Sequence, residues 1–491
     1  MGLLYDTPLP PLAASPLTGA TFAQFYFYVV RKKAERVILM LQSHSFKAMH
    51  IFDSYTRTYL RIALPAALEG IFMTFLAAAD LIMVGVLGPK AIAAVSIFLP
   101  LRLVLLTVSR SLASAITILT ANKFGAGDMQ GIRSLQRQSF TMSLILLAAL
   151  HLAFYAAFDT LVVLMGAQSD YLELALAYGH IAVAAVLVNS LSLVLQGVQL
   201  GIGQTASIMK SNIAGNVLNI VCNYFLITGF GNFAGWGVRG AAISTIIGSL
   251  CTLGITVYIM CREGCFNGGV FQLPDKSFWH EFLPIFGGVF SELGAERIGM
   301  LAYGWMTARL GTLPYAVHSI CYNICDFSYD FIFGFGKANM VLAGQARGAG
   351  DFALWRRYQR LGYKWGFGLA VFFFCVLYFG RVPIFSVYSS DSAALALSEL
   401  IMFWVAAVGL PQAHTIITAG ILRGSGRTTE VAAYSFVLIS ILRPLMTAFF
   451  IYYCELGIIG AWTAMFCDQS LRSLCFSWKV HKIRRLSDLQ V

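Results

Sequence analysis

Ionisable, amide and hydroxyl side chains stand inside several long apolar blocks of this sequence. A charged side chain at the centre of a bilayer costs roughly 2.5 to 3.5 kcal/mol, so each such group needs a partner or a function. Carboxylates and amides in this setting suit the binding of a cation or a proton. Block by block, they are Glu69 and Asp80, then Asn216, Asn219 and Asn223, then Ser244 and Thr245, then Glu292, Glu296 and Arg297, and finally Asp326, Asp330 and Lys337.

The three asparagines share one side of the expected fifth helix. Asn219 and Asn223 are four residues apart, and Asn216 lies one turn earlier. A carboxylate opposite this face would complete an oxygen-rich cluster for Na⁺, or would itself bind a proton. The amides could equally hold neighbouring helices together, as polar groups do in membranes. The residues alone leave both interpretations open.

The charged residues of the seventh and eighth blocks also allow two interpretations. Glu296 and Arg297 are adjacent and so point in different directions, and an internal salt bridge to a neighbouring helix is the simpler account. Asp326 and Asp330 share a face, with Lys337 two turns beyond. An ion-pair network and a cavity-lining acidic pair are both consistent with this spacing.

The composition places these blocks in a membrane. Hydrophobic residues make up 58% of the 491 and charged residues 12%, and the mean hydropathy is +0.73. Soluble domains are nearer a quarter charged. Because the blocks are about twenty residues or longer and show no barrel-type alternation, we expect a helical protein that crosses the membrane repeatedly. The ten cysteines lie mostly in apolar blocks without the spacing of a zinc site, so we expect no structural metal.

The net charge of +11 does not indicate nucleic acid, because the basic residues are concentrated in alternate connections between blocks. The connections near 167–171 and 389–392 carry none. This asymmetry follows the positive-inside rule and places both termini in the cytoplasm. The basic connections follow the second, fourth, sixth, eighth, tenth and twelfth blocks, and include Lys123, Arg133, Lys210, Arg262, Arg347, Arg356, Arg423, Arg427 and Lys479.

An internal repeat gives the strongest signal. Three motifs recur in the same order and at one constant offset, here called the repeat offset: LGPKAIAAVSI from Leu87 as LGTLPYAVHSI from Leu310, Gly-Ala-Gly-Asp from Gly125 at Gly348, and Gly-x-Gly-x-Thr from Gly201 at Gly424. A fourth, Gly-x-x-Gly-Ala from Gly237, recurs at Gly457, at nearly the same offset. Each motif falls between the same two blocks of its half, where glycine suits the turns at helix ends.

Each half therefore holds six helices, an even number, so both halves enter the membrane from the same side. The predicted fold is an all-α integral membrane protein with twelve transmembrane helices in two lobes, related by a pseudo-two-fold axis along the membrane normal. For residues 1–54, an amphipathic helix and an irregular tail are both possible. The expected divisions are a cytoplasmic N-terminal extension (1–54), a first lobe (55–261), a cytoplasmic linker (262–278), a second lobe (279–480) and a basic tail (481–491).

Together the motifs resemble those of the multidrug and toxic compound extrusion (MATE) family, over roughly residues 55 to 480. The matching stretches include ADLIMVGVLGPKAIAAVS from Ala79, ANKFGAGD from Ala121, LPIFGGVFSE from Leu283 and AGILRGSGRT from Ala419. The resemblance implies secondary antiport, in which efflux of cationic, often aromatic compounds is driven by inward Na⁺ or H⁺. It implies no cofactor beyond that coupling ion.

By position, the resemblance assigns the coupling cation to Asp80, Asn219, Asn223 and Thr245 in the first lobe. Glu292 matches the family's glutamate in the second lobe and is a candidate for substrate or proton. The tenth-helix position that is aspartate in some members is Gln412 here, with His414 nearby. Because this removes a second carboxylate from that lobe, we expect coupling in the first lobe, centred on Asp80.

We therefore expect a multi-pass transporter of the plasma (inner) membrane that acts as a monomer and is not an enzyme. The alternative is a flippase for a lipid-linked or polar lipid substrate from the same superfamily, which would need a strongly cationic central cavity. A membrane enzyme would need clustered catalytic residues, and the eight histidines are scattered. A channel is disfavoured because doubled lobes suit alternating access.

Overall fold

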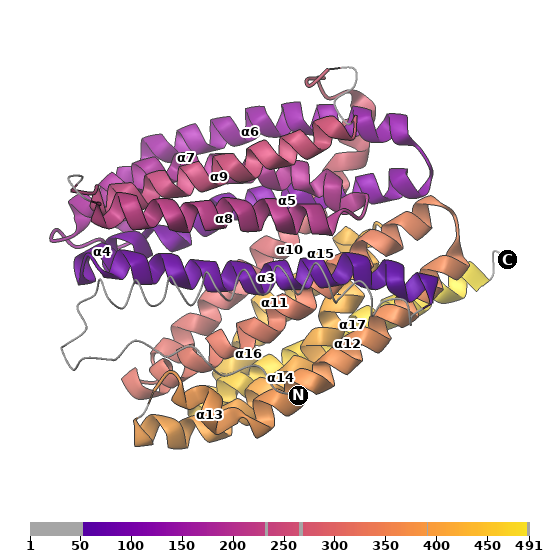
Figure 1. Ribbon diagram of the computed structural model, residues 1–491. Coiled ribbons are helices and arrows are strands. Elements are labelled where there is room, and N and C mark those ends of the chain that lie inside the picture. Colours follow the sequence, from indigo (N-terminus) through magenta and orange to yellow (C-terminus); the bar gives the residue numbers. More distant parts are fainter. Residues whose placement is uncertain (1–52, 231–233, 265–268, 390, 489–491) are drawn as a thin grey trace, which may run out of the picture. The chain divides into compact units, whose positions relative to one another are not determined.

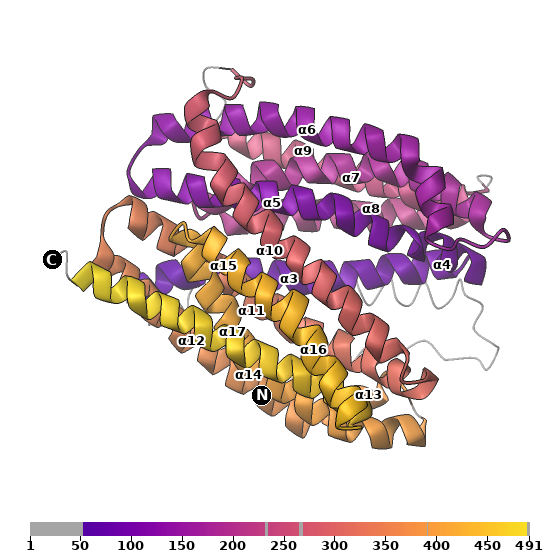
Figure 2. The same cartoon turned by 180° about the vertical axis from the view of Figure 1, so that it is seen from behind.

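The structure, a computed structural model, describes residues 53–230, 234–264, 269–389 and 391–488. Residues 1–52 lie outside this range, and with them nearly all of the expected N-terminal extension; the end of the basic tail lies outside it as well. Within the described ranges the secondary structure is almost entirely helical (Figures 1 and 2). The expected all-α class is therefore confirmed.

Six long helical segments make up the first half. The second of them is split near Ile97 into a short outer piece and a long inner one. Their bounds are α3 (Ser54–Gly85), α4 (Pro89–Ser96) with α5 (Phe98–Gly125), α6 (Met129–Leu164), α7 (Leu172–Gly201), α8 (Thr205–Thr228) and α9 (Gly237–Arg262).

The second half repeats this order. Its fifth segment is interrupted by two π-helical stretches, and α13 is a short extra turn. The bounds are α10 (Lys276–Ala308), α11 (Thr312–Gly348), α12 (Phe352–Phe379), α13 (Arg381–Ser386), α14 (Ser392–Gly424), the broken segment α15 (Thr428–Ser435), η2 (Phe436–Leu442), α16 (Arg443–Ala448) and η3 (Phe449–Tyr453), and finally α17 (Gly457–Asp488).

Eight of these segments are long and apolar enough, by length and composition, to cross a membrane. The other long helices of the described chain, α8, α10, α11 and α17, do not meet the same test. These are the helices that carry most of the asparagine, carboxylate and arginine side chains discussed below. The helices that are too polar to meet the test are therefore the ones that carry most of the functional candidates, as expected for polar groups retained inside a membrane.

The repeated Gly-Ala-Gly-Asp motif forms the same turn twice. Gly127 and Gly350 have φ of 74° and 67°, values that favour glycine. The next residue caps the following helix: the Asp128 carboxylate accepts a hydrogen bond from the Gly131 N–H at 2.7 Å, and the Asp351 carboxylate accepts one from the Leu354 N–H at 2.8 Å. The two halves thus share local structure as well as helix order.

The halves meet where α5 crosses α11, at the ends of the helices that carry this motif. A Cβ added to Gly125 would lie 1.9 Å from the Gln345 carbonyl oxygen, and one added to Gly348 would lie 1.9 Å from the Asn122 carbonyl oxygen. Under the repeat offset Gly125 corresponds to Gly348 and Asn122 corresponds to Gln345, so each contact is the equivalent of the other. Glycine is required there because the two backbones touch, and the equal distances place this crossing on the pseudo-two-fold axis.

Candidate functional site

The first-lobe candidates lie between α3, α8 and α9. The Asn223 side-chain amide donates to the Asp80 carboxylate at 2.8 Å, and the Asn219 amide lies 3.5 Å from the Thr245 hydroxyl. Asn219 and Asn223 are buried one turn apart on α8. The four residues proposed for the coupling cation are therefore neighbours, arranged as two hydrogen-bonded pairs.

This cluster retains unused capacity to bind a cation. The side-chain oxygen of Asn223 is buried and has no hydrogen-bond donor within the described part of the chain. The positive charge of Arg102 on α5 lies near Asp80, but among the described residues the two form no ion pair. Arg102 was not anticipated from the sequence. A buried amide oxygen beside a carboxylate supplies oxygen ligands of the kind that hard cations prefer.

A second carboxylate of α3 also has amide partners. The Asn212 amide donates to Glu69 at 2.5 Å, and the Gln196 amide donates to the Asn212 side-chain oxygen at 2.8 Å. Asn216, the third asparagine of the α8 face, instead donates to the Asn212 carbonyl oxygen at 2.7 Å. Both first-lobe carboxylates of α3 are thus hydrogen-bonded to neutral groups.

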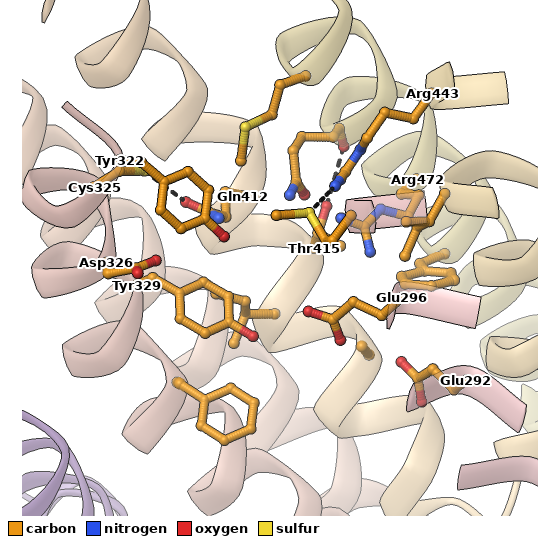
Figure 3. A pocket seen from close by; sticks show the side chains of 18 of the residues that line it. Glu292, Glu296, Tyr322, Cys325, Asp326, Tyr329, Gln412, Thr415, Arg443 and Arg472 are labelled. Carbon is orange, nitrogen blue, oxygen red and sulfur yellow. Dashed lines mark hydrogen bonds between the residues drawn. The ribbon is translucent and has the colours of Figure 1, made fainter. Parts of the chain in front are cut away.

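The second-lobe candidates line a cavity of about 110 Å³ (Figure 3). Glu292 and Gln412, both about nine-tenths or more buried, contribute to its wall. Gln412 lies 3.9 Å from the Cys325 sulfur. A pocket for a drug-sized ligand usually measures roughly 300 Å³ or more, so this cavity has room for a charged head group rather than a whole molecule.

Glu292 is held by a cation. Arg423 donates to it through two nitrogens, at 2.9 Å from Nε to Oε2 and 2.5 Å from the terminal nitrogen to Oε1. In the sequence Arg423 was counted with the basic connection after the tenth helix, and its pairing with Glu292 was missed. Only 20% of the Arg423 side chain is exposed, so the pair is largely shielded from solvent.

A second ion pair lies at the same cavity, whose wall includes Arg443 and Arg472. Arg443 donates to Asp468 through Nε, at 3.1 Å, and through a terminal nitrogen. Arg472 lies 3.6 Å from the same carboxylate oxygen. Arg443 begins α16 between the two π-helical stretches, and Pro444 after it cannot donate to the helix, which accounts for the break. All three were missed, although each is an ionisable residue within an apolar block, the signal that identified the other candidates.

Two carboxylates in the cavity wall have no such partner. Glu296 and Asp326 approach the cavity from opposite sides (Figure 3) and form no hydrogen bond or ion pair within the described residues. The salt bridge to a neighbouring helix that was considered for Glu296 or Arg297 is therefore not formed among the described residues. Asp330 does not share the environment of Asp326: it accepts a hydrogen bond from Thr74 on α3 at 2.7 Å. Lys337 lies over the Phe333 ring at 5.7 Å rather than in an ion pair.

Two lobes of six helices, with ionisable side chains grouped at membrane depth in each, define a multi-pass membrane transporter. A family model described as MatE matches residues 65–225 and 292–449, which is well over half of the chain. The chain belongs to the MATE family. The resemblance seen in the motifs is confirmed.

The chain is also similar to individual family members. A probable multidrug resistance protein NorM of Thermotoga maritima is 26% identical over 423 residues, covering 84% of this chain and 89% of that protein. A probable NorM of Xanthomonas axonopodis is 26% identical over 381 residues, covering 76% and 82%.

Solved structures show the same fold. A crystal structure of a MATE protein in complex with MaL6 matches with a TM-score of 0.81 at 19% identity, over 89% of this chain and 98% of that one. An outward-facing multidrug resistance MATE transporter matches with a TM-score of 0.80 at 20% identity, over 89% and 97%. The expected twelve-helix, two-lobed architecture is confirmed by these matches.

Proposed function

We propose that this protein is a secondary active antiporter that exports small cationic or aromatic compounds in exchange for Na⁺ or H⁺, by alternating access of its two lobes. The observation that carries the proposal is the hydrogen bond between Asn223 and Asp80. It is a carboxylate whose hydrogen-bond partner is neutral, so its charge can change without breaking an ion pair. The names of the relatives as multidrug resistance proteins agree with export of small molecules.

The coupling step follows from this geometry. Asp80, oriented by Asn223 and accompanied by Asn219 and Thr245, binds the cation when its site faces outward. Binding neutralises a charge that is costly to keep among apolar helices, and so favours the conformer in which the charge is enclosed. The site can face outward again only after the cation has left on the inner side. Inward movement of the cation is thereby linked to outward movement of the exported compound.

The cellular setting belongs to the same proposal. The alternation of basic connections supports a cytoplasmic position for both termini, and export from the cell requires the plasma membrane. We propose a multi-pass monomer without a cofactor, in which Na⁺ or H⁺ is a transported substrate.

The experiment uses purified protein in liposomes loaded with a fluorescent organic cation. A Na⁺ gradient, a pH gradient or neither is imposed on wild type, Asp80→Asn and Glu292→Gln. We expect efflux driven by one gradient in the wild type and in Glu292→Gln, and none in Asp80→Asn. Normal driven efflux by Asp80→Asn at equal incorporation would overturn the assignment of the coupling site.

A flippase is the second candidate, because the charges of Arg102 and Arg297 both lie near that of Arg110. Asp80 and Asp330 stand beside them, so the region is not uniformly cationic. Absence of gradient-driven movement for every soluble cation would favour the flippase, and lipid-linked substrates would be tested next.

A further inference from the structure

The second carboxylate of α3, Glu69, stands in the same relation to α8 as Asp80 does. The Asn212 amide donates to Glu69 at 2.5 Å and lies 143 positions after it in the chain. The Asn223 amide donates to Asp80 at 2.8 Å, and the separation is again 143 positions. The two helices therefore run parallel and side by side (Figure 1). Since Glu69 and Asp80 are three helical turns apart, they share one side of α3 at a spacing of about 16 Å.

A row of asparagines on α8, here called the asparagine strip, extends between the two acids. Its members follow one another at intervals of four, three and four residues, which keeps them on one face of the helix: Asn212, Asn216, Asn219 and Asn223. The Asn216 amide lies 3.4 Å from the Met73 sulfur, so this face is turned toward α3. The side-chain oxygens of Asn216, Asn219 and Asn223 accept no hydrogen bond from any described residue. Unused oxygen ligands of the kind that hard cations prefer therefore lie between Asp80 and Glu69.

Neutral amides, rather than a cationic side chain, hold Glu69 within the described part of the chain. Gln196 of α7 donates to the Asn212 side-chain oxygen at 2.8 Å, and Glu69 forms no ion pair with any described residue. Asp330 of α11 packs against the residue that follows Glu69, but its carboxylate accepts a hydrogen bond from Thr74 on another side of α3. A carboxylate without a counter-ion among apolar helices favours a bound cation or proton.

Buried polar groups continue beyond Glu69 toward the ends at which α3 and α8 begin, which the proposed topology places at the cytoplasm. Gln199 lies one turn beyond Gln196 on α7, and neither polar atom of its amide has a partner among the described residues. The hydroxyl of Thr120 on α5 is also buried without a partner there, and Thr120 packs against Gly201, the last residue of α7. Buried polar groups normally have partners, so these two suit a route that is occupied during transport.

The repeat shows that the fold does not require the asparagine strip. Under the repeat offset, its four positions correspond to Ser435, Ile439, Leu442 and Met446. Gln196 and Gln199 correspond to Ala419 and Leu422. The second half builds the same helix order with mostly apolar residues at these positions. Amides that served only to hold helices together would be needed in both halves. The strip therefore indicates a function that belongs to the first lobe.

We propose that Glu69, with Asn212 and Gln196, forms an inner binding site for the coupling cation. The cation moves from Asp80 to Glu69 along the asparagine strip before it leaves to the cytoplasm. The strip supplies oxygens to Na⁺, or holds the water through which H⁺ passes. Each acid has a neutral partner, so it can lose and regain its charge without breaking an ion pair. This inference rests on the proposed export function and adds the inward route of the cation to it.

The first test labels the site in the wild-type protein. Purified protein in detergent is treated with dicyclohexylcarbodiimide, which modifies protonated carboxyl groups, at neutral pH and at a series of Na⁺ concentrations balanced with choline. Mass spectrometry of peptides measures the labelling of Glu69. The reference is Glu173, an exposed carboxylate in the first turn of α7 that has no partner among the described residues.

Protection of Glu69 by Na⁺ identifies a sodium site, and strong labelling that Na⁺ does not change identifies a proton site. Either result supports the inference. If Glu69 is no more reactive than Glu173 at any Na⁺ concentration, the inference is overturned.

The second test measures gradient-driven efflux of a fluorescent organic cation from liposomes that contain wild type, Glu69→Gln or the matched control Glu173→Gln. We expect Glu69→Gln to lower the maximal rate at least about tenfold, because the cation loses a charged ligand on its way inward. The outer cation concentration that gives half-maximal efflux does not rise, since Asp80 still binds the cation. Glu69→Asp keeps the carboxylate and restores part of the rate, while Glu173→Gln stays at the wild-type rate. A raised half-maximal concentration with an unchanged maximal rate in Glu69→Gln would contradict the inner site.

The two tests together separate this inference from the export proposal. If the wild type moves no dye under any gradient, the export proposal fails, and selective labelling of Glu69 still supports a cation site there. If efflux is driven in the wild type and lost in Asp80→Asn but keeps its full rate in Glu69→Gln, the export proposal stands and the inner site is overturned.

A last variant tests the route itself. Asn216→Ile introduces the residue that the second half has at the equivalent position, Ile439. We expect it to slow efflux while the labelling of Glu69 remains as in the wild type, because the site is intact and only the passage to it is altered. Efflux at the full wild-type rate in Asn216→Ile would show that the cation does not follow the asparagine strip.

Discussion

Glu69 and Glu292 occupy equivalent positions of the two halves under the repeat offset, yet they have different partners. Glu69 of the first lobe accepts a hydrogen bond from the Asn212 amide at 2.5 Å. Glu292 of the second lobe is held by two nitrogens of the Arg423 guanidinium. The same contrast recurs nearby, because Asp80 is bound by the Asn223 amide whereas Asp468 is bound by Arg443. For these four acids, the hydrogen-bond partners are amides in the first lobe and guanidinium groups in the second.

This difference indicates which lobe contains carboxylates that can lose and regain their charge. Neutralising a carboxylate that has an amide partner leaves no charge behind, because the amide is neutral and still finds an acceptor. Neutralising a carboxylate in an ion pair leaves a buried guanidinium unpaired, which is strongly unfavourable. Asp80 and Glu69 are therefore suited to bind and release a cation during each transport cycle. Glu292 and Asp468 are suited to keep their charge and to hold the helices of the second lobe in place.

The largest effect on stability is expected from Asp468→Asn. Both members of its pair are almost fully buried, with 3% of the Arg443 side chain and none of the Asp468 side chain exposed. Loss of the carboxylate charge should lower the free energy of unfolding by about 3 to 5 kcal/mol. Thermal unfolding in detergent can be followed by the reaction of a thiol dye with the buried Cys321 and Cys325.

The matched variant in the other lobe is Asp80→Asn, in which the acid has an amide partner. We expect it to unfold at nearly the wild-type temperature although it no longer couples efflux. Equal destabilisation by the two substitutions would contradict the contrast between the lobes.

A smaller difference is expected at the equivalent pair. Glu292→Gln leaves Arg423 without its counter-ion, and we expect a loss of about 2 kcal/mol, reduced from the fully buried case because Arg423 is one-fifth exposed. Glu69→Gln keeps a hydrogen-bonding group beside Asn212 and should cost less than about 1 kcal/mol. Unfolding temperatures of the two single variants provide the comparison.

The double variant Glu292→Gln with Arg423→Gln shows whether the cost comes from the unpaired cation. Removal of both charges should recover most of the stability lost in Glu292→Gln alone. A double variant as unstable as the sum of the two single variants would show that the pair does not act as a unit.

Local features of the structure were predictable from the sequence, and long-range partners were not. The repeated glycine motifs predicted the turns at helix ends, because each turn depends on neighbouring residues such as Gly127 and Asp128. The Asn219 and Asn223 face followed from helix periodicity, and family resemblance supplied Asp80 as its partner. By contrast, Glu292 and Arg423 are far apart in the chain, and only packing within the second half brings them together.

The misassignment of Arg423 has the same origin. In the sequence Arg423 stands in the same basic connection as Arg427, and the residues of that connection gave no reason to treat the two arginines differently. In the structure Arg427 pairs locally with Glu430 at 2.8 Å, less than one helical turn away, while Arg423 turns back into the lobe. A count of charges per connection cannot show which way a side chain points, because tertiary packing decides that direction.

The smallest effects are expected where the lobes do not differ. Asp128 and Asp351 cap α6 and α12 through nearly equal hydrogen bonds, of 2.7 and 2.8 Å, to the third residue of each helix. Asp128→Ala and Asp351→Ala should each cost about 1 kcal/mol, the usual value for loss of such a cap. Because both caps lie at exposed turns and neither forms an ion pair within the described residues, the two costs should be equal. Unfolding temperatures that differ between these variants as much as those of Glu69→Gln and Glu292→Gln would mean that the second lobe is more sensitive to any substitution, and the contrast in carboxylate partners would no longer explain the difference.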